Sequence, residues 1–398
     1  MHLRWLQQDM SGHLGAECDS IAQAIVAGRG FSDPFQEPSG PTAWMPPVLP
    51  YLTAAVYWLT GNNRSYVIDF FVTLHAIAVL LMGWIVIRQA RRLQITLFGY
   101  VVLITGLSAN FHQLFQTTHD SGLLLLVVSI LWIGIVKYWD RLQSARNAIL
   151  WGIFGGIIAL CSPAIGFAWS AITSARLLLN RDGKIGQRIG YLILSALMAM
   201  VIVTPWTIRN RVVLGKWIPI KPNGMYELWQ SQCLDDDGVL DWEACSFHPW
   251  PSAGEQRQRY KDVGEIAFIE EKGEIAKASI RMAPMTFVNR VANRWFASCI
   301  YYSPFYAEYE LYTWPILFKR LVFPIPWLSI LLVLAIRKSP LSPEILAAIW
   351  ICVLCLIPYI LISYYERYAT PLLGMKLLLV VFAIDAIWPS RRPKNRAA

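Results

Sequence analysis

The chain has 398 residues, of which 56% are hydrophobic and only 15% are charged. Soluble domains carry about 25% charged residues, so this composition excludes an ordinary soluble protein and indicates the membrane class. The net charge of +9 does not indicate a nucleic-acid-binding protein, because the basic residues stand at the ends of apolar runs, as topology signals do. The seven cysteines lack zinc-type spacing, so no metal site is expected from them.

The first 63 residues contain two apolar segments that are too short to cross a bilayer. Residues 18–27 place their apolar side chains near one face, which predicts a helix lying in the membrane interface. Residues 47–60 are expected to lie along the boundary or to dip into it. We assign residues 1–63 to a first extracytoplasmic loop. The opening residues lack the apolar core of a signal peptide, so we expect an upstream first helix to precede this start site.

Long apolar runs dominate the rest of the chain. A spanning helix needs about 20 mostly apolar residues, because each residue adds about 1.5 Å and the hydrocarbon core is about 30 Å thick. The stretch 148–179 is too long for one span and is interrupted at Ser162-Pro163, so two helices are expected there. The sequence therefore predicts an all-α polytopic membrane protein with about nine transmembrane helices. The other seven runs are 65–87, 94–110, 120–136, 187–207, 321–336, 344–363 and 370–388.

Lys and Arg residues occur in every second short connection, which predicts that these connections are cytoplasmic. The connections between them at 111–119 and 162–163 hold no basic residue, and 364–369 holds only Arg367. The chain is thus predicted to be a multi-pass protein of the plasma (inner) membrane with a cytoplasmic C-terminus. Its parts are the first outer loop, a bundle over 64–208, a large extracytoplasmic loop over 209–314, and C-terminal helices with a basic cytoplasmic tail over 315–398.

Four segments resemble a family of known enzymes. AGRGFSDPFQEPSGPTAWMPP, within residues 27–61, is similar to the first outer loop of bacterial GT-C glycosyltransferases related to protein mannosyltransferases and aminoarabinose transferases. PWTIRNRVVLGKW, within 205–229, resembles the segment that leaves a middle helix in that group. HPWPSAGEQRQRY, within 248–284, and YYERYATPLL, at 364–373, resemble later landmarks in the same order. The absent first helix is the departure from the family pattern.

The resemblance implies a transferase that takes a sugar from a polyprenyl-phosphate-linked donor. It also implies a lipid, glycan or protein acceptor on the extracytoplasmic side, and no certain cofactor, although a divalent metal is compatible with the chemistry. A donor with its tail in lipid and its sugar in water can react only at the boundary, where the outer loops are predicted to lie. The lipid bilayer is therefore an expected partner, and nucleic acid is not.

Such a reaction needs a base for the acceptor hydroxyl, and Glu17 and Asp19 in the first outer loop are the candidates. The resemblance favours Glu17. Two residues apart on a helix, the two carboxylates would point in different directions, so we do not expect both to serve. The alternative is that either residue caps the helix that begins near Ser20.

The departing phosphate needs positive charge, and Arg suits it because the guanidinium forms paired charge-assisted hydrogen bonds. Arg367 is the first candidate, as the basic residue of a short outer loop; an interfacial anchor or a partner of Glu366 is the alternative. Arg209 and Arg211, just beyond a predicted helix end, are second candidates. For at least one of these two, snorkelling at the helix terminus is the simpler explanation.

Four further residues are weaker candidates for donor or acceptor contacts. His119 and Asp120 open a predicted span from its outer side, where a carboxylate is costly unless it is paired or hydrated. They predict a donor-site or metal contact, or else an N-cap of that helix. Glu227 and His248 lie in the large outer loop, where a lone His is usually only solvated.

Two other function classes remain open. A transporter or flippase of lipid-linked sugars would show internal repeats and charges at the membrane midplane, whereas the polar residues here gather at one side. A non-catalytic partner of another transferase is the third interpretation, because fold does not determine function. Convergence of Glu17, Arg367 and the pair His119-Asp120 on one outward-facing cavity would favour the enzyme.

Overall fold

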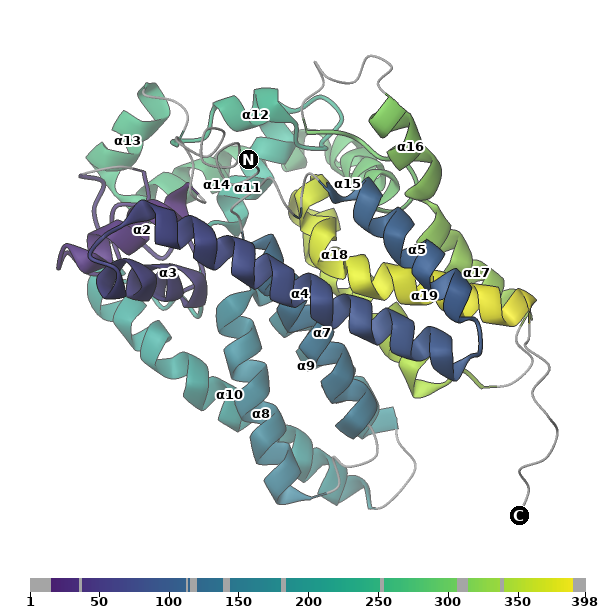
Figure 1. The fold of residues 1–398 in the computed structure, drawn as a ribbon. Coiled ribbons are helices and arrows are strands. Elements are labelled where there is room, and N and C mark those ends of the chain that lie inside the picture. Colours follow the sequence, from purple (N-terminus) through teal and green to yellow (C-terminus); the bar gives the residue numbers. More distant parts are fainter. Residues whose placement is uncertain are drawn as a thin grey trace.

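The structure is a computed structural model, and it describes residues 16–35, 38–111, 114, 120–138, 144–179, 184–250, 254–305, 314–336 and 340–388. Within these ranges the chain is helical apart from its turns and loops, as Figure 1 shows. Extended pairing in this part is confined to two isolated bridges, Ser32 with Pro41 and Val239 with Tyr364. The predicted all-α class is confirmed for the described residues.

The two short apolar segments of the first loop form helices, as the sequence predicts. They are α2 (Glu17–Val26) and α3 (Val48–Leu59). A short connection then leads into the long helix α4 (Arg64–Arg92), whose start is capped by the Asn63 side chain accepting a 3.0 Å hydrogen bond from the Ser65 amide. Such a cap satisfies one of the amides that the first helical turn leaves without a partner.

The apolar helices of the first half follow in the predicted order. They are α5 (Thr96–Ala109), α7 (Ser121–Tyr138), α8 (Ala145–Cys161), α9 (Pro163–Leu179) and α10 (Ile185–Leu214). The predicted interruption at Ser162-Pro163 is confirmed, because α8 ends and α9 begins there. α10 ends at Gly215, which has φ 72°, a left-handed conformation that glycine adopts without a steric penalty.

The large loop folds into short helices, and the apolar helices of the second half follow it. The loop contains α11 (Gly224–Trp229), a π-helical turn (Gln230–Leu234), α12 (Trp242–Ser246), α13 (Glu255–Val263), α14 (Glu265–Met282) and α15 (Pro284–Cys299). After it come α16 (Trp314–Val322), α17 (Ile325–Ile336), α18 (Pro343–Ile362), a 3₁₀ segment (Glu366–Leu372) and α19 (Leu373–Ile387).

Among the residues that the structure describes, five stretches of helix are long and apolar enough to cross a bilayer. They are α4, α10, α16 with α17, α18, and the 3₁₀ segment with α19. Other predicted spans give shorter helices; α5, for example, has 14 residues and is about 21 Å long, less than the hydrocarbon thickness. The structure therefore supports a membrane protein, whereas the count of nine spans stays a prediction.

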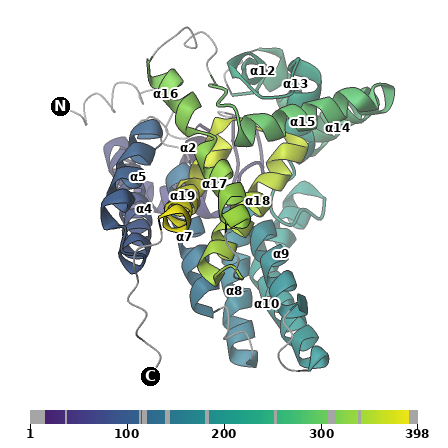
Figure 2. The same cartoon turned by 90° about the vertical axis from the view of Figure 1, so that its right-hand side faces the viewer.

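The helices of the large loop lie together at one end of the molecule. Figures 1 and 2 show α11–α15 at the top in both views, while α8, α9 and α10 extend to the opposite end. The main core joins α4, α7, α18 and α19, with Val128, Ile351 and Leu378 fully buried. α10 lies at the edge and exposes large apolar side chains, including Ile193, Met200 and Val212, as a helix facing lipid does.

α8 and α10 pack closely because α8 presents glycines to its neighbour. A Cβ atom added at Gly152 would lie 2.4 Å from the Ser195 carbonyl oxygen, and one at Gly156 would lie 2.6 Å from Ile202 Cβ. The two glycines are four residues apart and so share one helix face. Small residues at this spacing let the backbones of membrane helices approach each other.

Candidate active site

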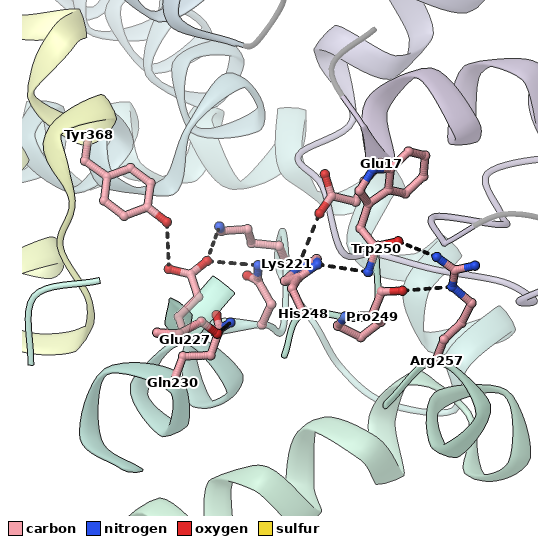
Figure 3. A network of polar contacts seen from close by, with 11 residues as sticks. Glu17, Lys221, Glu227, Gln230, His248, Pro249, Trp250, Arg257 and Tyr368 are labelled. Carbon is pink, nitrogen blue, oxygen red and sulfur yellow. Dashed lines mark hydrogen bonds and ion pairs between the residues drawn. The ribbon is translucent and has the colours of Figure 1, made fainter. Parts of the chain in front are cut away.

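Glu17 and Asp19 have different surroundings on α2. Asp19 is buried, and its carboxylate accepts hydrogen bonds from the Tyr57 hydroxyl at 2.5 Å and from Gln23 at 2.8 Å. It therefore ties α2 to α3. Glu17 points elsewhere, with Oε1 lying 3.4 Å from Nε2 of His248 (Figure 3). Of the two predicted base candidates, the structure leaves Glu17 with the more open carboxylate.

The Glu17 carboxylate lies in an environment that disfavours its charge. Burial raises the pKa of Glu17, and Asp120 acts in the same direction, whereas the positive charges of Arg367 and Lys221 act against the shift. The side chain is still 18% exposed, which leaves it within reach of a bound substrate. A carboxylate with a raised pKa is a stronger base than a solvated one, which suits proton abstraction from a hydroxyl.

His248 is held in place by its loop and by an aromatic cluster. Its Nδ1 accepts a hydrogen bond from the Trp250 amide at 3.2 Å, and its ring lies 5.4 Å from Phe35 and 5.7 Å from Trp44. Burial lowers the pKa of His248 to about 4, so the ring is neutral at pH 7. With Nδ1 accepting, the ring proton is assigned to Nε2, where it faces Glu17. The contact is therefore an approach of a neutral imidazole to the carboxylate at 3.4 Å, not an ion pair.

Arg257 of α13 fixes the backbone beside His248. Its guanidinium donates to the Pro249 carbonyl at 2.9 Å and to the Trp250 carbonyl, as Figure 3 shows. These bonds join α13 to the segment that carries His248. His248, a predicted site residue on a loop, is thus held in place through the two residues that follow it in the chain.

Glu227 connects the large loop to the segment before α19. Its carboxylate accepts hydrogen bonds from Asn223 at 2.9 Å, from Lys221 at 3.2 Å and from the Tyr368 hydroxyl at 3.3 Å (Figure 3). The site prediction included Glu227 but none of its three partners. Lys221 also acts electrostatically on Glu17, so this network belongs to the same site.

Arg367 lies on the 3₁₀ segment, next to both networks. Its guanidinium carbon is 5.3 Å from the Tyr365 ring centroid, and its charge acts on Glu17 and on His248. Its Nε atom is buried and has no hydrogen-bond partner within the described part of the chain. Asp120, just before α7, interacts electrostatically with Arg367 and Glu17, whereas His119 lies outside the described residues. Glu17, Arg367 and Asp120 thus interact electrostatically with one another, whereas their convergence with His119 on one cavity stays a prediction.

Arg209 and Arg211 have other partners. Arg209 donates hydrogen bonds of 2.6 Å to the carbonyl oxygens of Thr42 and Phe31, and it lies 5.0 Å from the Trp206 ring centroid. Arg211 donates to the Gly215 carbonyl at the end of α10. Both guanidiniums donate hydrogen bonds to backbone carbonyl oxygens. These contacts do not favour phosphate binding by either residue, which stays a prediction.

Glu265 is a buried residue of the site region that the sequence prediction did not include. Its carboxylate accepts hydrogen bonds from the Ala43 amide at 2.8 Å, from the Tyr260 hydroxyl at 2.9 Å and from the Thr42 hydroxyl. It thereby joins the segment between α2 and α3 to α14. In sequence, an acidic residue in a first helical turn resembles a common partner of the helix dipole, so nothing marked it as special.

The site can supply a base, a neutral hydrogen-bond donor and an incompletely paired guanidinium. Among the residues that the structure describes, no group of three or more His, Cys, Asp or Glu side chains is arranged to hold a metal ion. Comparisons with protein-family models, with curated proteins and with solved structures found no match for this chain. The assignment of a function therefore depends on the geometry and on the sequence patterns.

Proposed function

We propose that the protein is a membrane glycosyltransferase that moves a sugar from a polyprenyl-phosphate-linked donor to an acceptor on the extracytoplasmic side. The observation that carries the proposal is the electrostatic interaction of the Glu17 carboxylate with the Arg367 guanidinium, beside His248 of the large loop. A base and a phosphate-binding cation are the two groups that this transfer needs. The resemblance to GT-C glycosyltransferases adds to the proposal.

In the proposed step, the acceptor hydroxyl oxygen attacks the anomeric carbon of the donor sugar. Glu17 accepts the hydroxyl proton, a new glycosidic bond forms, and the bond from the sugar to the phosphate oxygen breaks. The leaving group is polyprenyl phosphate, whose negative charge the Arg367 guanidinium stabilises. His248 lies beside the Glu17 carboxylate, with Nε2 at 3.4 Å from Oε1.

Charge and aromatic placement support the proposed orientation in the bilayer. Arg92 at the end of α4 forms a 2.6 Å ion pair with Glu344 at the start of α18, which joins two ends that the basic-loop pattern assigns to the cytoplasmic side. At the other side, Trp295 of α15 and Trp314 of α16 are exposed, as aromatic residues of a membrane interface are. The inner-membrane location, the nine spans and the outer position of 209–314 belong to the proposal.

The experiment that tests the function is donor profiling. Purified protein is incubated with a panel of polyprenyl-phosphate sugars, and the release of free polyprenyl phosphate is measured with and without candidate acceptors. We expect release with one class of donor sugar. If every donor stays intact while vesicles containing the protein move lipid-linked sugar across the bilayer, the protein is a transporter and the proposal is wrong.

A further inference from the structure

Lys376 is a buried cation outside the Glu17 site. It lies in the first turn of α19, within the apolar stretch Glu366–Ile387, and only 7% of its surface is exposed. A charged side chain inside a membrane span costs a few kcal/mol and is normally paired or functional. Lys376 therefore needs a physical explanation.

The surroundings of Lys376 do not neutralise its charge. Its ammonium nitrogen lies 4.9 Å from the Phe323 ring centroid and 6.0 Å from that of Trp327, and its electrostatic neighbours are the thiols Cys299 and Cys352. Among the described residues it forms no ion pair or hydrogen bond. Lys319 offers the contrast within the same region, because it pairs with the Tyr302 hydroxyl at 2.9 Å and with Glu366 at 3.7 Å.

One other polar group near Lys376 also lacks a partner. The Trp327 indole nitrogen is buried and has no hydrogen-bond partner in the part of the chain that the structure describes. An ammonium and an indole N–H can only donate hydrogen bonds. Two such groups without acceptors are complementary to an anion that offers several oxygen atoms.

The position of these groups indicates where the anion comes from. α17, which carries Trp327, exposes Leu328, Leu331 and Leu334 along one face. An acyl chain can lie along the exposed leucines while its headgroup phosphate reaches the donors. A free anion would have to leave water to occupy the same place, which costs free energy.

We propose that Lys376 and Trp327 form a second binding site, which takes the phosphate group of a membrane lipid. This site is separate from the Glu17 and Arg367 site, and it does not depend on the protein being a glycosyltransferase. The lipid phosphate would supply the acceptor oxygens that the ammonium and the indole lack. Its bound chains would cover the leucine face of α17.

Native mass spectrometry of the purified protein tests the proposal. Phosphatidylglycerol, a diacylglycerol without phosphate, and inorganic phosphate are titrated separately. We expect the wild type to retain one phosphatidylglycerol and to bind neither of the other two. Lys376→Met should weaken this binding at least about tenfold, with partial rescue in Lys376→Arg and no change in Lys277→Met, which alters an exposed cation.

Lys376→Met is expected to fold, because a flexible apolar side chain of similar length replaces a buried charge. Trp327→Phe is the second variant; it keeps an aromatic ring but removes the N–H group together with part of the indole, and it should weaken lipid binding several-fold. Unchanged phosphatidylglycerol binding in both folded variants would overturn the proposal. Binding of inorganic phosphate without lipid would overturn its assignment to a lipid.

Discussion

Two neighbouring carboxylates on α2 illustrate how much residue-level reasoning can predict. Their spacing alone predicts that Glu17 and Asp19 point apart, and the structure pairs Asp19 with Tyr57 while Glu17 faces His248. The identity of the partner was not predictable, because His248 lies in another loop and its position depends on Arg257 and on the aromatic cluster. The types of residue in the sequence indicated candidate site residues, whereas the partners of these residues could be identified only from the fold.

The raised pKa of Glu17 predicts the pH dependence of the reaction. Glu17 can accept a proton only when ionised, and burial moves its pKa upward from the usual value for a Glu side chain. Turnover should therefore rise with pH through the raised pKa and be lost as the pH falls below it. His248 is neutral above its pKa of about 4, so its ionisation should not change turnover near neutral pH.

The measurement is the pH profile of kcat for wild type and Glu17→Gln. The acidic limb should be present in the wild type and absent from the residual activity of the variant. An acidic limb that persists unchanged in Glu17→Gln would assign the titrating base to another residue, with Asp19 the next to test.

Glu265 shows what the sequence did not reveal at this scale. All three of its partners donate hydrogen bonds, and two of them, Thr42 and Ala43, belong to a loop more than two hundred residues away. Burial raises its pKa, while the hydrogen bonds from Thr42, Ala43 and Tyr260 act in the opposite direction. We infer that the carboxylate accepts these three bonds in its ionised form.

Glu265→Gln should therefore destabilise the protein by about 1–3 kcal/mol, because an amide N–H group would face a donor. The measurement is the thermal unfolding temperature in detergent, with Glu274→Gln as the control at an exposed position of the same helix. Equal unfolding temperatures for the two variants would mean that Glu265 is protonated in the folded protein, contrary to our inference.

At the scale of elements, hydrophobic run length predicts the apolar helices well and their packing poorly. The interruption between α8 and α9 follows from a proline, and α4 and α18 match their predicted runs closely. The close approach of α8 to α10 did not follow from hydropathy, because glycine contributes little to an apolar run. The spacing of Gly152 and Gly156 places them on one face of α8, but only the fold shows that α10 packs against this face.

Gly152→Ala tests this packing. The added Cβ would lie 2.4 Å from the Ser195 carbonyl oxygen, so one helix must move, at an expected cost of about 1–3 kcal/mol. Gly190→Ala on α10 is the matched control, since its Cβ would meet nothing within 4 Å and alanine favours helix by up to about 1 kcal/mol. The unfolding temperature in detergent should fall for the first variant and not for the second. A Gly152→Ala protein as stable as the control would contradict the close packing.

At the scale of the whole molecule, the charge pattern predicts an orientation that the helix arrangement can accommodate. The helices of the large loop gather at one end, and Arg92 and Glu344 join helix ends from the predicted cytoplasmic side (Figure 1). The sequence could not predict that α11, α13 and α14 would enclose an aromatic cluster with Phe35 and Trp44 of the segment between α2 and α3. That cluster depends on contacts such as Trp44 with Tyr226, which connect distant segments.

Cysteine accessibility tests the orientation. In a Cys233→Ser background, a cysteine at Asp236 should react with an impermeant thiol reagent on intact cells, because Asp236 is exposed on the large loop. A cysteine at Lys184 should react only after the cells are permeabilised. Labelling of Lys184→Cys with protection of Asp236→Cys would reverse the whole arrangement.

The most direct test of the central claim compares polyprenyl phosphate release by the wild type and by Glu17→Gln under the same conditions. The variant keeps the size and polarity of the side chain but cannot take the hydroxyl proton. We predict a loss of about 10²–10⁴-fold in turnover with little change in unfolding temperature, while Glu274→Gln keeps full activity. Near-normal release by a well-folded Glu17→Gln protein would contradict the assignment of Glu17 as the base.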